Sequence, residues 1–137
     1  ICESGLSGEQ QRQLADILTV QRENRSKEGI MDFIIRERDF YHLLMEFGGR
    51  ELVWELFQRM ECDLRRLDYL RYTTFNYQEH MSSLSSSDNS MVEGRLLLDK
   101  LKCRETEAAC LVCSNHFNTV LWSFDTLRGI YPQYFAE

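Results

Sequence analysis

The fold of this chain is decided by residues 29–47, GIMDFIIRERDFYHLLMEF, which are followed by Gly48 and Gly49. Apolar side chains recur here three and four positions apart, which is the spacing of one face of an α-helix. The charged residues 36–39 form either the solvated face of one continuous helix or a bend between two helices. The two glycines are the clearest stop signal in the chain, so we expect the helix to end there.

Helices are also predicted on both sides of this stretch. Ser7 and Gln10 form a capping box, in which each side chain bonds to the backbone amide of the other residue, so a helix begins after Ser7. Apolar side chains keep helical spacing over residues 50–72, and the polar residues 61–63 predict a break within this segment. Residues 73–76 are expected to form a turn.

The second half of the chain begins with a loop signal and continues with two helices. Residues 82–90 are rich in Ser and also contain Asp and Asn, which predicts a loop. Ser90 and Glu93 form a second capping box, which predicts a helix over residues 91–102. The last long helix is expected over residues 106–122 or 106–127, and Gly129 is expected to end it.

Composition favours an all-α fold. The 137 residues include 7 Gly and 1 Pro, whereas all-β sandwiches and barrels use these residues for turns about every ten positions. We therefore predict an all-α protein, a compact bundle of six to seven helices with short connections. Aromatic side chains, Trp54 and Trp122 among them, are expected to lie in its core.

The charge and the apolar pattern limit the classes of partner. The chain carries 16 basic and 22 acidic residues, a formal net charge of -6. This balance argues against nucleic acid, because phosphate binding needs a basic face. No apolar run reaches the length of about 18 residues that a membrane span needs, so no membrane partner is expected. The start, Ile-Cys-Glu-Ser-Gly, is not a signal peptide and resembles the start of an excised fragment, so we expect a cytoplasmic location.

The 5 Cys are expected to be reduced thiols, mostly small buried apolar groups. A zinc site is the alternative, since Cys110, Cys113 and His116 could supply three tetrahedral ligands with Cys103 nearby. These residues lie in an apolar helical run, however, and no second close pair of Cys exists. A Cys–His nucleophile would need an orienting carboxylate, which no local pattern supplies. We therefore predict no enzyme, no catalytic residue, no metal ligand and no cofactor.

Four short pieces of residues 40–137 carry apolar spacing and charges that are found together in a known family. They are residues 50–53, 67–81, 94–101 and 122–134. On these pieces the chain resembles a caspase-recruitment domain of the death-fold superfamily, although residues 101–122 are longer than the family usually has there. Residues 50–70 also resemble the end of a death-effector domain, with Arg66-Leu67-Asp68 at its basic-x-acidic signature; this family is the second choice.

The resemblance implies a non-catalytic signalling adaptor of apoptosis or innate immunity. Such domains associate with the same or a similar helical domain and form homo-oligomers, placing an acidic face against a basic one. On the resemblance, the interface is expected to use Arg50, Arg59, Arg65, Arg66, Arg71, Asp63, Asp68, Asp88, Glu93 and Asp99.

Two further questions stay open on the sequence. Residues 1–39 are predicted to be N-terminal helices, a truncated or divergent first copy, and residues 40–137 to be the caspase-recruitment-like bundle. A weak similarity between the two halves leaves a fused tandem as an alternative. The alternative function is a helical scaffold that receives a partner's amphipathic helix in an apolar groove.

Overall fold

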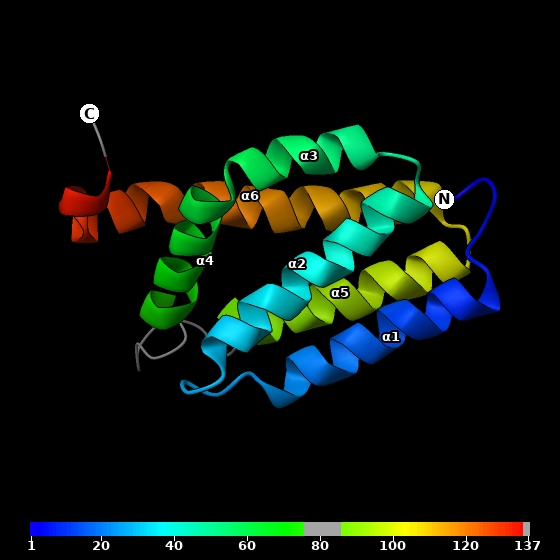
Figure 1. The fold of residues 1–137 in the computed structure, drawn as a ribbon, viewed down its shortest axis with the longest axis horizontal. Coiled ribbons are helices and arrows are strands. Elements are labelled where there is room, and N and C mark those ends of the chain that lie inside the picture. Colours follow the sequence, from blue (N-terminus) through cyan, green and yellow to red (C-terminus); the bar gives the residue numbers. More distant parts are fainter. Residues whose placement is uncertain (76–85, 136–137) are drawn as a thin grey trace.

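A computed structural model of the protein describes residues 1–75 and 86–135, which contain helices and no strand (Figure 1). The predicted all-α fold class is therefore confirmed, with six α-helices and one short 3-10 helix in the described ranges. None of these helices combines the length and the apolarity that a membrane crossing requires. The elements are α1 Gly8–Glu23, α2 Ile30–Phe47, α3 Glu51–Arg59, α4 Glu61–Phe75, α5 Ser86–Lys102, α6 Thr106–Ile130 and η1 Pro132–Tyr134.

Local signals set the first three helix boundaries as predicted. The capping box of α1 is present, with the Gln10 amide 3.2 Å from the Ser7 hydroxyl and the Ser7 amide 2.9 Å from the Gln10 side-chain oxygen. The helix α2 is continuous through its charged residues and ends before Gly48. Gly49 has a φ of 62°, a left-handed conformation that favours glycine, and it turns the chain into α3. The expected break is also present, because α3 ends at Arg59 and α4 begins at Glu61.

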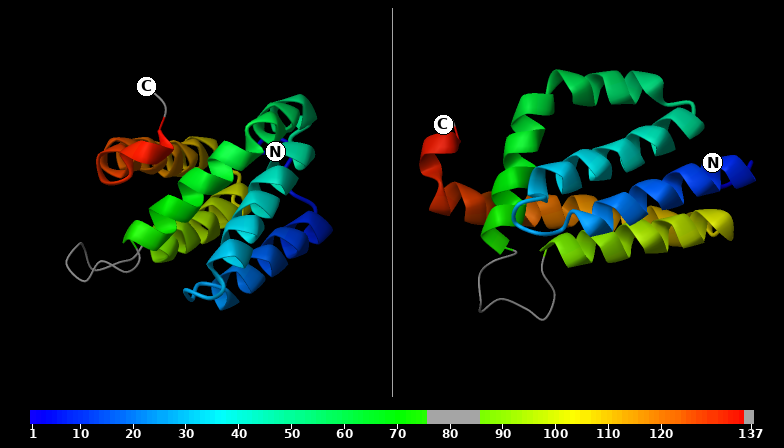
Figure 2. Two further views of the ribbon diagram at one scale, coloured as in Figure 1. Left: turned by 60° about the vertical axis from the view of Figure 1, so that its left-hand side comes forward. Right: turned by 60° about the horizontal axis from the view of Figure 1, so that its bottom comes forward.

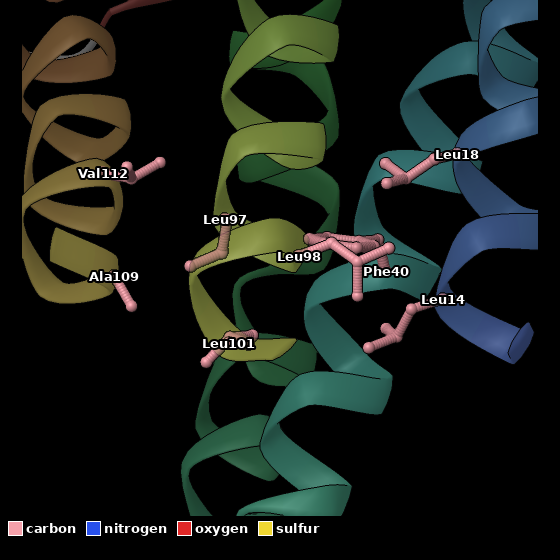
Figure 3. Packing of buried hydrophobic residues seen from close by; sticks show 8 residues of the cluster. All are labelled: Leu14, Leu18, Phe40, Leu97, Leu98, Leu101, Ala109 and Val112. Atoms are coloured by element: carbon pink, nitrogen blue, oxygen red, sulfur yellow. The ribbon is translucent and has the colours of Figure 1, made fainter. Parts of the chain in front are cut away.

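The main apolar core lies between α1, α2, α5 and α6 (Figure 3). Leu14 of α1, Phe40 of α2 and Leu97 of α5 are each at most 1% exposed. The helices α1 and α5 approach closely at Gly94, where an added Cβ would lie 2.9 Å from the Leu18 side chain. A second buried cluster joins α2 to α4 and α5 through Ile30, Phe33, Ile34, Tyr72 and Met91.

The predicted boundary between residues 39 and 40 does not separate two packing units. Both residues lie within the continuous helix α2. The helix α1 packs against α2 and α5 in the same core, and the three run side by side in Figure 1. The four helices α1, α2, α5 and α6 therefore share one apolar interior.

Three predicted local boundaries are wrong. Helix α4 continues to Phe75 where a turn was expected, and its Thr73 hydroxyl bonds back to the Tyr69 carbonyl at 2.6 Å within the helix. Ser90 is not a helix cap, because α5 is helical from Ser86 and the Ser90 hydroxyl donates inward to Glu37. Helix α6 passes through Gly129 and ends at Ile130. The first part of the serine-rich segment, residues 82–85, lies outside the described residues.

The expectation of an aromatic core built on the two Trp residues is also wrong. Trp122 is 79% exposed, and Trp54 is only half-buried. The reason for Trp122 is geometric: α6 has 25 residues, and its C-terminal part projects past the other long helices (Figure 2). Leu121, the neighbour of Trp122 on α6, is likewise 66% exposed, whereas Leu127 further along the helix is buried. Leucines, together with Phe33, Phe40 and Tyr72, fill the interior instead.

Candidate functional site

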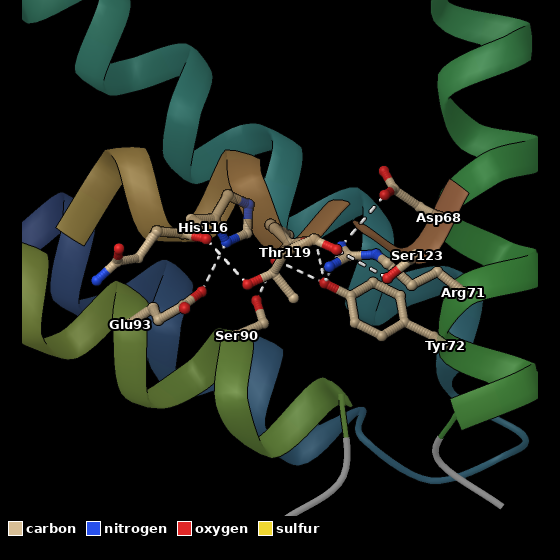
Figure 4. A network of polar contacts seen from close by, with 10 residues as sticks. Asp68, Arg71, Tyr72, Ser90, Glu93, His116, Thr119 and Ser123 are labelled. Carbon is tan, nitrogen blue, oxygen red and sulfur yellow. Dashed lines mark hydrogen bonds and ion pairs between the residues drawn. The ribbon is translucent and has the colours of Figure 1, made fainter. Parts of the chain in front are cut away.

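A network of polar side chains lies where α2, α4, α5 and α6 meet (Figure 4). Glu37 of α2 is 6% exposed, and its carboxylate accepts hydrogen bonds from the Tyr72 hydroxyl at 2.6 and 2.7 Å. The Ser90 hydroxyl of α5 donates to the same carboxylate. Three helices therefore meet on one buried acidic side chain.

Arg71 of α4 supplies the positive charge of this network. It is 2% exposed, and its Nη2 donates to the Tyr72 hydroxyl at 2.8 Å and to the Asp68 carboxylate at 3.3 Å. The same nitrogen lies 3.8 Å from Glu37, which is an ion pair without a hydrogen bond. The guanidinium also stacks over the Tyr72 ring at 4.4 Å, and its Nε has no partner.

His116 of α6 pairs with a third carboxylate beside this network. It is 5% exposed, and its Nδ1 lies 2.9 Å from the Glu93 carboxylate of α5. The His116 ring also packs on the Tyr41 ring with the centroids 5.0 Å apart. The buried Glu37 and the half-buried Glu93 and Asp68 thus lie around one buried guanidinium and one buried imidazole.

Burial and charge shift the protonation equilibria of this network. Burial raises the pKa of Asp68 from its usual value of 3.8 to about 6, and the nearby charge of Glu37 adds to the rise, although Arg71 opposes it. Burial and Glu37 likewise raise the pKa of Tyr72 well above its ordinary range, so this hydroxyl stays a donor. Burial acts to lower the pKa of Arg71, but Tyr72, Glu37 and Asp68 together leave it raised.

A cavity of about 130 Å³ lies beside the network, between α2, α3, α4 and α6. Glu37, Asp68 and His116 contribute to its wall, so the cavity adjoins the polar network. Met45 lies on α2 eight residues after Glu37, which is about 12 Å along the helix, so the wall that α2 contributes extends well beyond the network. The apolar wall is formed by Met45, Trp54, Phe57, Leu64, Phe117 and Val120.

The helix α3 covers the cavity from outside the bundle. None of its residues is buried, although Trp54 and Phe57 both line the cavity. Trp54 fixes α3 to α2, since its ring stacks on His42 at 4.4 Å and carries the Arg38 guanidinium at 5.6 Å. The indole Nε1 of Trp54 is buried and has no hydrogen-bond partner.

The structure does not bring the predicted interface residues together on one surface. Arg71 is buried, and Asp68 and Glu93 turn inward to Arg71 and His116. Asp88 pairs with Arg25 at 3.4 Å. The remaining members lie on the outside or are half-buried, and their use as an interface stays a prediction: Arg50, Arg59, Arg65, Arg66, Asp63 and Asp99.

The cysteines are not the buried apolar groups that the sequence predicts. Cys62, Cys103 and Cys110 are exposed, while Cys2 and Cys113 are half-buried. His116 turns to Glu93 rather than to a thiol. Across residues 1–75 and 86–135, no group of three or more His, Cys, Asp or Glu side chains could hold a metal ion.

Sequence reasoning missed Glu37, Tyr72 and Ser90 as site residues. A signal for Glu37 was present, because it follows Phe33 by four positions and precedes Phe40 by three, which places it on the apolar face of α2. A carboxylate at such a position must be paired inside the protein. Tyr72 and Ser90 gave no such signal.

One family model matches the chain: the FCD domain, over residues 4–119. No curated protein and no solved structure matches it. FCD domains are the ligand-binding effector domains of GntR-family transcription regulators and are not catalytic. The prediction that the protein is not an enzyme therefore agrees with its family.

The match overturns the death-fold interpretation. The chain is neither a caspase-recruitment domain nor a death-effector domain, so the adaptor function in apoptosis or innate immunity is wrong, and so is its scaffold alternative. The error has a physical reason, because amphipathic helical spacing is common to every helical bundle and does not distinguish one family from another. The exclusion of nucleic acid is also wrong, since regulators with this domain typically bind DNA through an N-terminal domain.

The matched region includes α1 to α5 and the first half of α6, and therefore every helix that contributes to the buried network and the cavity. Because the match spans 4–119 of 137 residues, the chain belongs to the FCD domain family.

Proposed function

We propose that this domain senses a small-molecule effector, which binds in the cavity between α2, α3, α4 and α6, as part of a transcription regulator. The observation that carries the proposal is that Glu37 and Asp68 belong both to the buried network and to the cavity wall. Buried charges rarely add stability over an apolar core of the same volume. Their position beside a partly apolar cavity is typical of a binding site.

The DNA contact is expected to lie elsewhere in such a regulator. Regulators with an FCD domain typically bind DNA through an N-terminal domain. The net charge of -6 is consistent with a regulator in which this domain binds the effector and another domain binds the phosphates of DNA. We expect the regulator to act in the cytoplasm, where it reaches DNA.

The helix α3 is the element that an effector would move. Trp54 and Phe57 would touch a ligand in the cavity, yet α3 packs mainly on α2 and buries none of its own residues. Elements with few buried contacts are the first to shift in a fold. Binding would therefore change the position of α3 more readily than that of the core helices.

A thermal-shift screen with a cavity-filling variant tests the proposal. Val120→Trp fills the cavity, and Val20→Trp on the outer face of α1, where Val20 is 41% exposed, is the matched control. A small molecule at a hundred times its Kd adds about 2.7 kcal/mol, or about 10 °C in Tm for a domain of this size. We expect at least one compound to stabilise the wild type and Val20→Trp but not Val120→Trp. A screen without such a compound, or equal shifts in all three proteins, overturns the proposal.

A further inference from the structure

Two cysteines that are far apart in the sequence line one pocket. Cys2 precedes α1 and Cys113 lies in the first half of α6, yet both contribute to the wall of a pocket at the end of α2. Both thiols are half-buried, and both side chains pack against the main apolar core. Tyr41, Met45 and Phe117 line this pocket and also the cavity beside the polar network, so the two spaces are neighbours.

The position of Cys2 is set by a turn that residues 1–5 form before α1. The Gly5 amide donates to the Ile1 carbonyl at 2.7 Å, and Gly5 has a φ of 77°, a left-handed conformation that favours glycine. The turn packs on the end of α2, where a Cβ added to Gly48 would lie 3.6 Å from the Ile1 side chain (Figure 1). Because the turn precedes α1, its backbone can shift without the loss of a hydrogen bond within a helix.

The ionisation of Cys113 gives a second sign that the two sulfurs are neighbours. Burial raises the pKa of the Cys113 thiol above its usual value of 9.0, and the negative charges that Cys110 and Cys2 carry as thiolates add to the rise. Solvent and salt screen such an influence within about 10 Å. The Cys2 sulfur is therefore close enough to Cys113 to affect its charge.

Cys110 is the other thiol near Cys113, but the helix holds these two apart. They are three positions apart in the continuous helix α6. The Cβ atoms of such residues are about 5–6 Å apart, whereas a disulfide needs about 3.5–4.5 Å. A disulfide between Cys110 and Cys113 would have to distort α6, so Cys2 is the better partner.

We propose that Cys2 and Cys113 are a redox-active thiol pair, which a low-molecular-weight disulfide converts reversibly into an intramolecular disulfide that ties the segment before α1 to α6. In the first step the Cys2 thiolate attacks a sulfur of glutathione disulfide, which gives a mixed disulfide and releases one glutathione thiolate.

Cys113 reacts second, because its raised pKa keeps most of this thiol protonated at pH 7. It loses its proton to the solvent, and its sulfur attacks the Cys2 sulfur and releases the second glutathione thiolate. The two protein thiols lose two electrons in total, and the glutathione disulfide gains them. Disulfides of this kind in reducing compartments are usually transient and sense the redox state.

Two variants with matched thiol content test the pair. The pair variant, Cys62→Ser with Cys103→Ser and Cys110→Ser, removes the three exposed thiols and keeps Cys2 and Cys113. The helix variant, Cys2→Ser with Cys62→Ser and Cys103→Ser, keeps Cys110 and Cys113 instead. Each is treated with glutathione disulfide at pH 8 and weighed intact by mass spectrometry, after circular dichroism has checked that it is folded.

We expect the pair variant to lose the mass of two hydrogen atoms, to carry no glutathione and to recover both thiols in dithiothreitol. The helix variant is expected to retain glutathione on its thiols. Glutathione that stays on the pair variant, or a cross-link between two chains, shows that the sulfurs do not meet and overturns the inference. An internal disulfide that forms equally well in the helix variant overturns it too.

Peptide mapping of the oxidised wild type without reduction decides the question if the pair variant does not fold. A cross-linked peptide that contains Cys2 and Cys113 supports the inference. Its absence from a map that accounts for all five cysteines overturns the inference.

Discussion

Replacing Arg71 by Met removes the guanidinium from the buried network while keeping an apolar side chain of similar length. The buried Glu37 and the half-buried Asp68 then lose their ion pairs with Arg71. Removing one partner of a buried ion pair typically costs about 3–5 kcal/mol. A domain of this kind has an unfolding free energy of about 5–15 kcal/mol. We therefore expect Arg71→Met to lose at least about a fifth of the stability at pH 7.

The cost of this substitution should depend on pH. Arg71 lowers the pKa of Asp68, so its removal lets Asp68 take up a proton at a higher pH. At pH 5 the protonated Asp68 side chain carries no charge, and the part of the penalty that comes from Asp68 disappears. Urea-induced unfolding, followed by far-UV circular dichroism at pH 7 and pH 5, measures both free energies. Arg66→Met is the matched control because Arg66 is exposed on the same helix, and it should change the stability by less than about 0.5 kcal/mol.

Two further variants keep the test decisive if Arg71→Met does not fold. Arg71→Lys retains the charge but loses the planar donor geometry, so it should cost less than Arg71→Met. The double variant with Glu37→Gln should recover part of the loss, with a coupling of about 0.5–3 kcal/mol. A cost for Arg71→Met as small as that for Arg66→Met, or one that does not fall between pH 7 and pH 5, would refute the role assigned to Arg71.

Three other perturbations have defined outcomes. Ser7→Ala should lower the unfolding free energy in urea by about 1 kcal/mol, because it removes the cap of α1; no change would mean that the cap is not formed. Leu97→Ala should cost about 2–5 kcal/mol, against less than about 0.5 for Leu121→Ala, since the two side chains are 1% and 66% exposed; equal costs would contradict this core. A carboxyl group whose pKa is raised on folding stabilises the fold below its unfolded pKa of 3.8 and loses that contribution as the pH rises through about 6. The stability of Asp68→Asn relative to wild type should therefore increase by up to about 3 kcal/mol between pH 4 and pH 7 in urea titrations; a constant difference would show that Asp68 titrates normally.

Local chemistry made part of the fold predictable. The capping box at Ser7 and Gln10, the glycine turn after α2 and the polar break before α4 each depend on a few neighbouring residues. Such signals act within one helical turn, so they can be recognised in the sequence even when the packing of the helices is not known. The prediction at Ser90 was wrong for the same reason. The sequence pattern of a capping box can also occur inside a longer helix, where the residue is not a cap.

The polar network could not be predicted from the sequence, because it depends on which faces of the helices pack against one another. Arg66 and Arg71 lie on the same helix and look equivalent in the sequence, yet one is exposed and the other is 2% exposed. The difference comes from α2, which brings Glu37 against Tyr72 across 35 positions of the chain. Pairings over such a distance leave no local pattern.

The position of Arg71 suggests how binding and conformation are coupled in this domain. Arg71 holds α4 against α2 through Asp68, Tyr72 and Glu37. An effector in the neighbouring cavity would contact the wall to which Glu37 and Asp68 contribute, and these are the residues that Arg71 holds. Any ligand that changes the free energy of this contact must also change the equilibrium position of α4 relative to α2. In the proposed function, the charged network would therefore have a use that an apolar core of equal volume could not supply, which is to let a bound effector alter how two helices are held together.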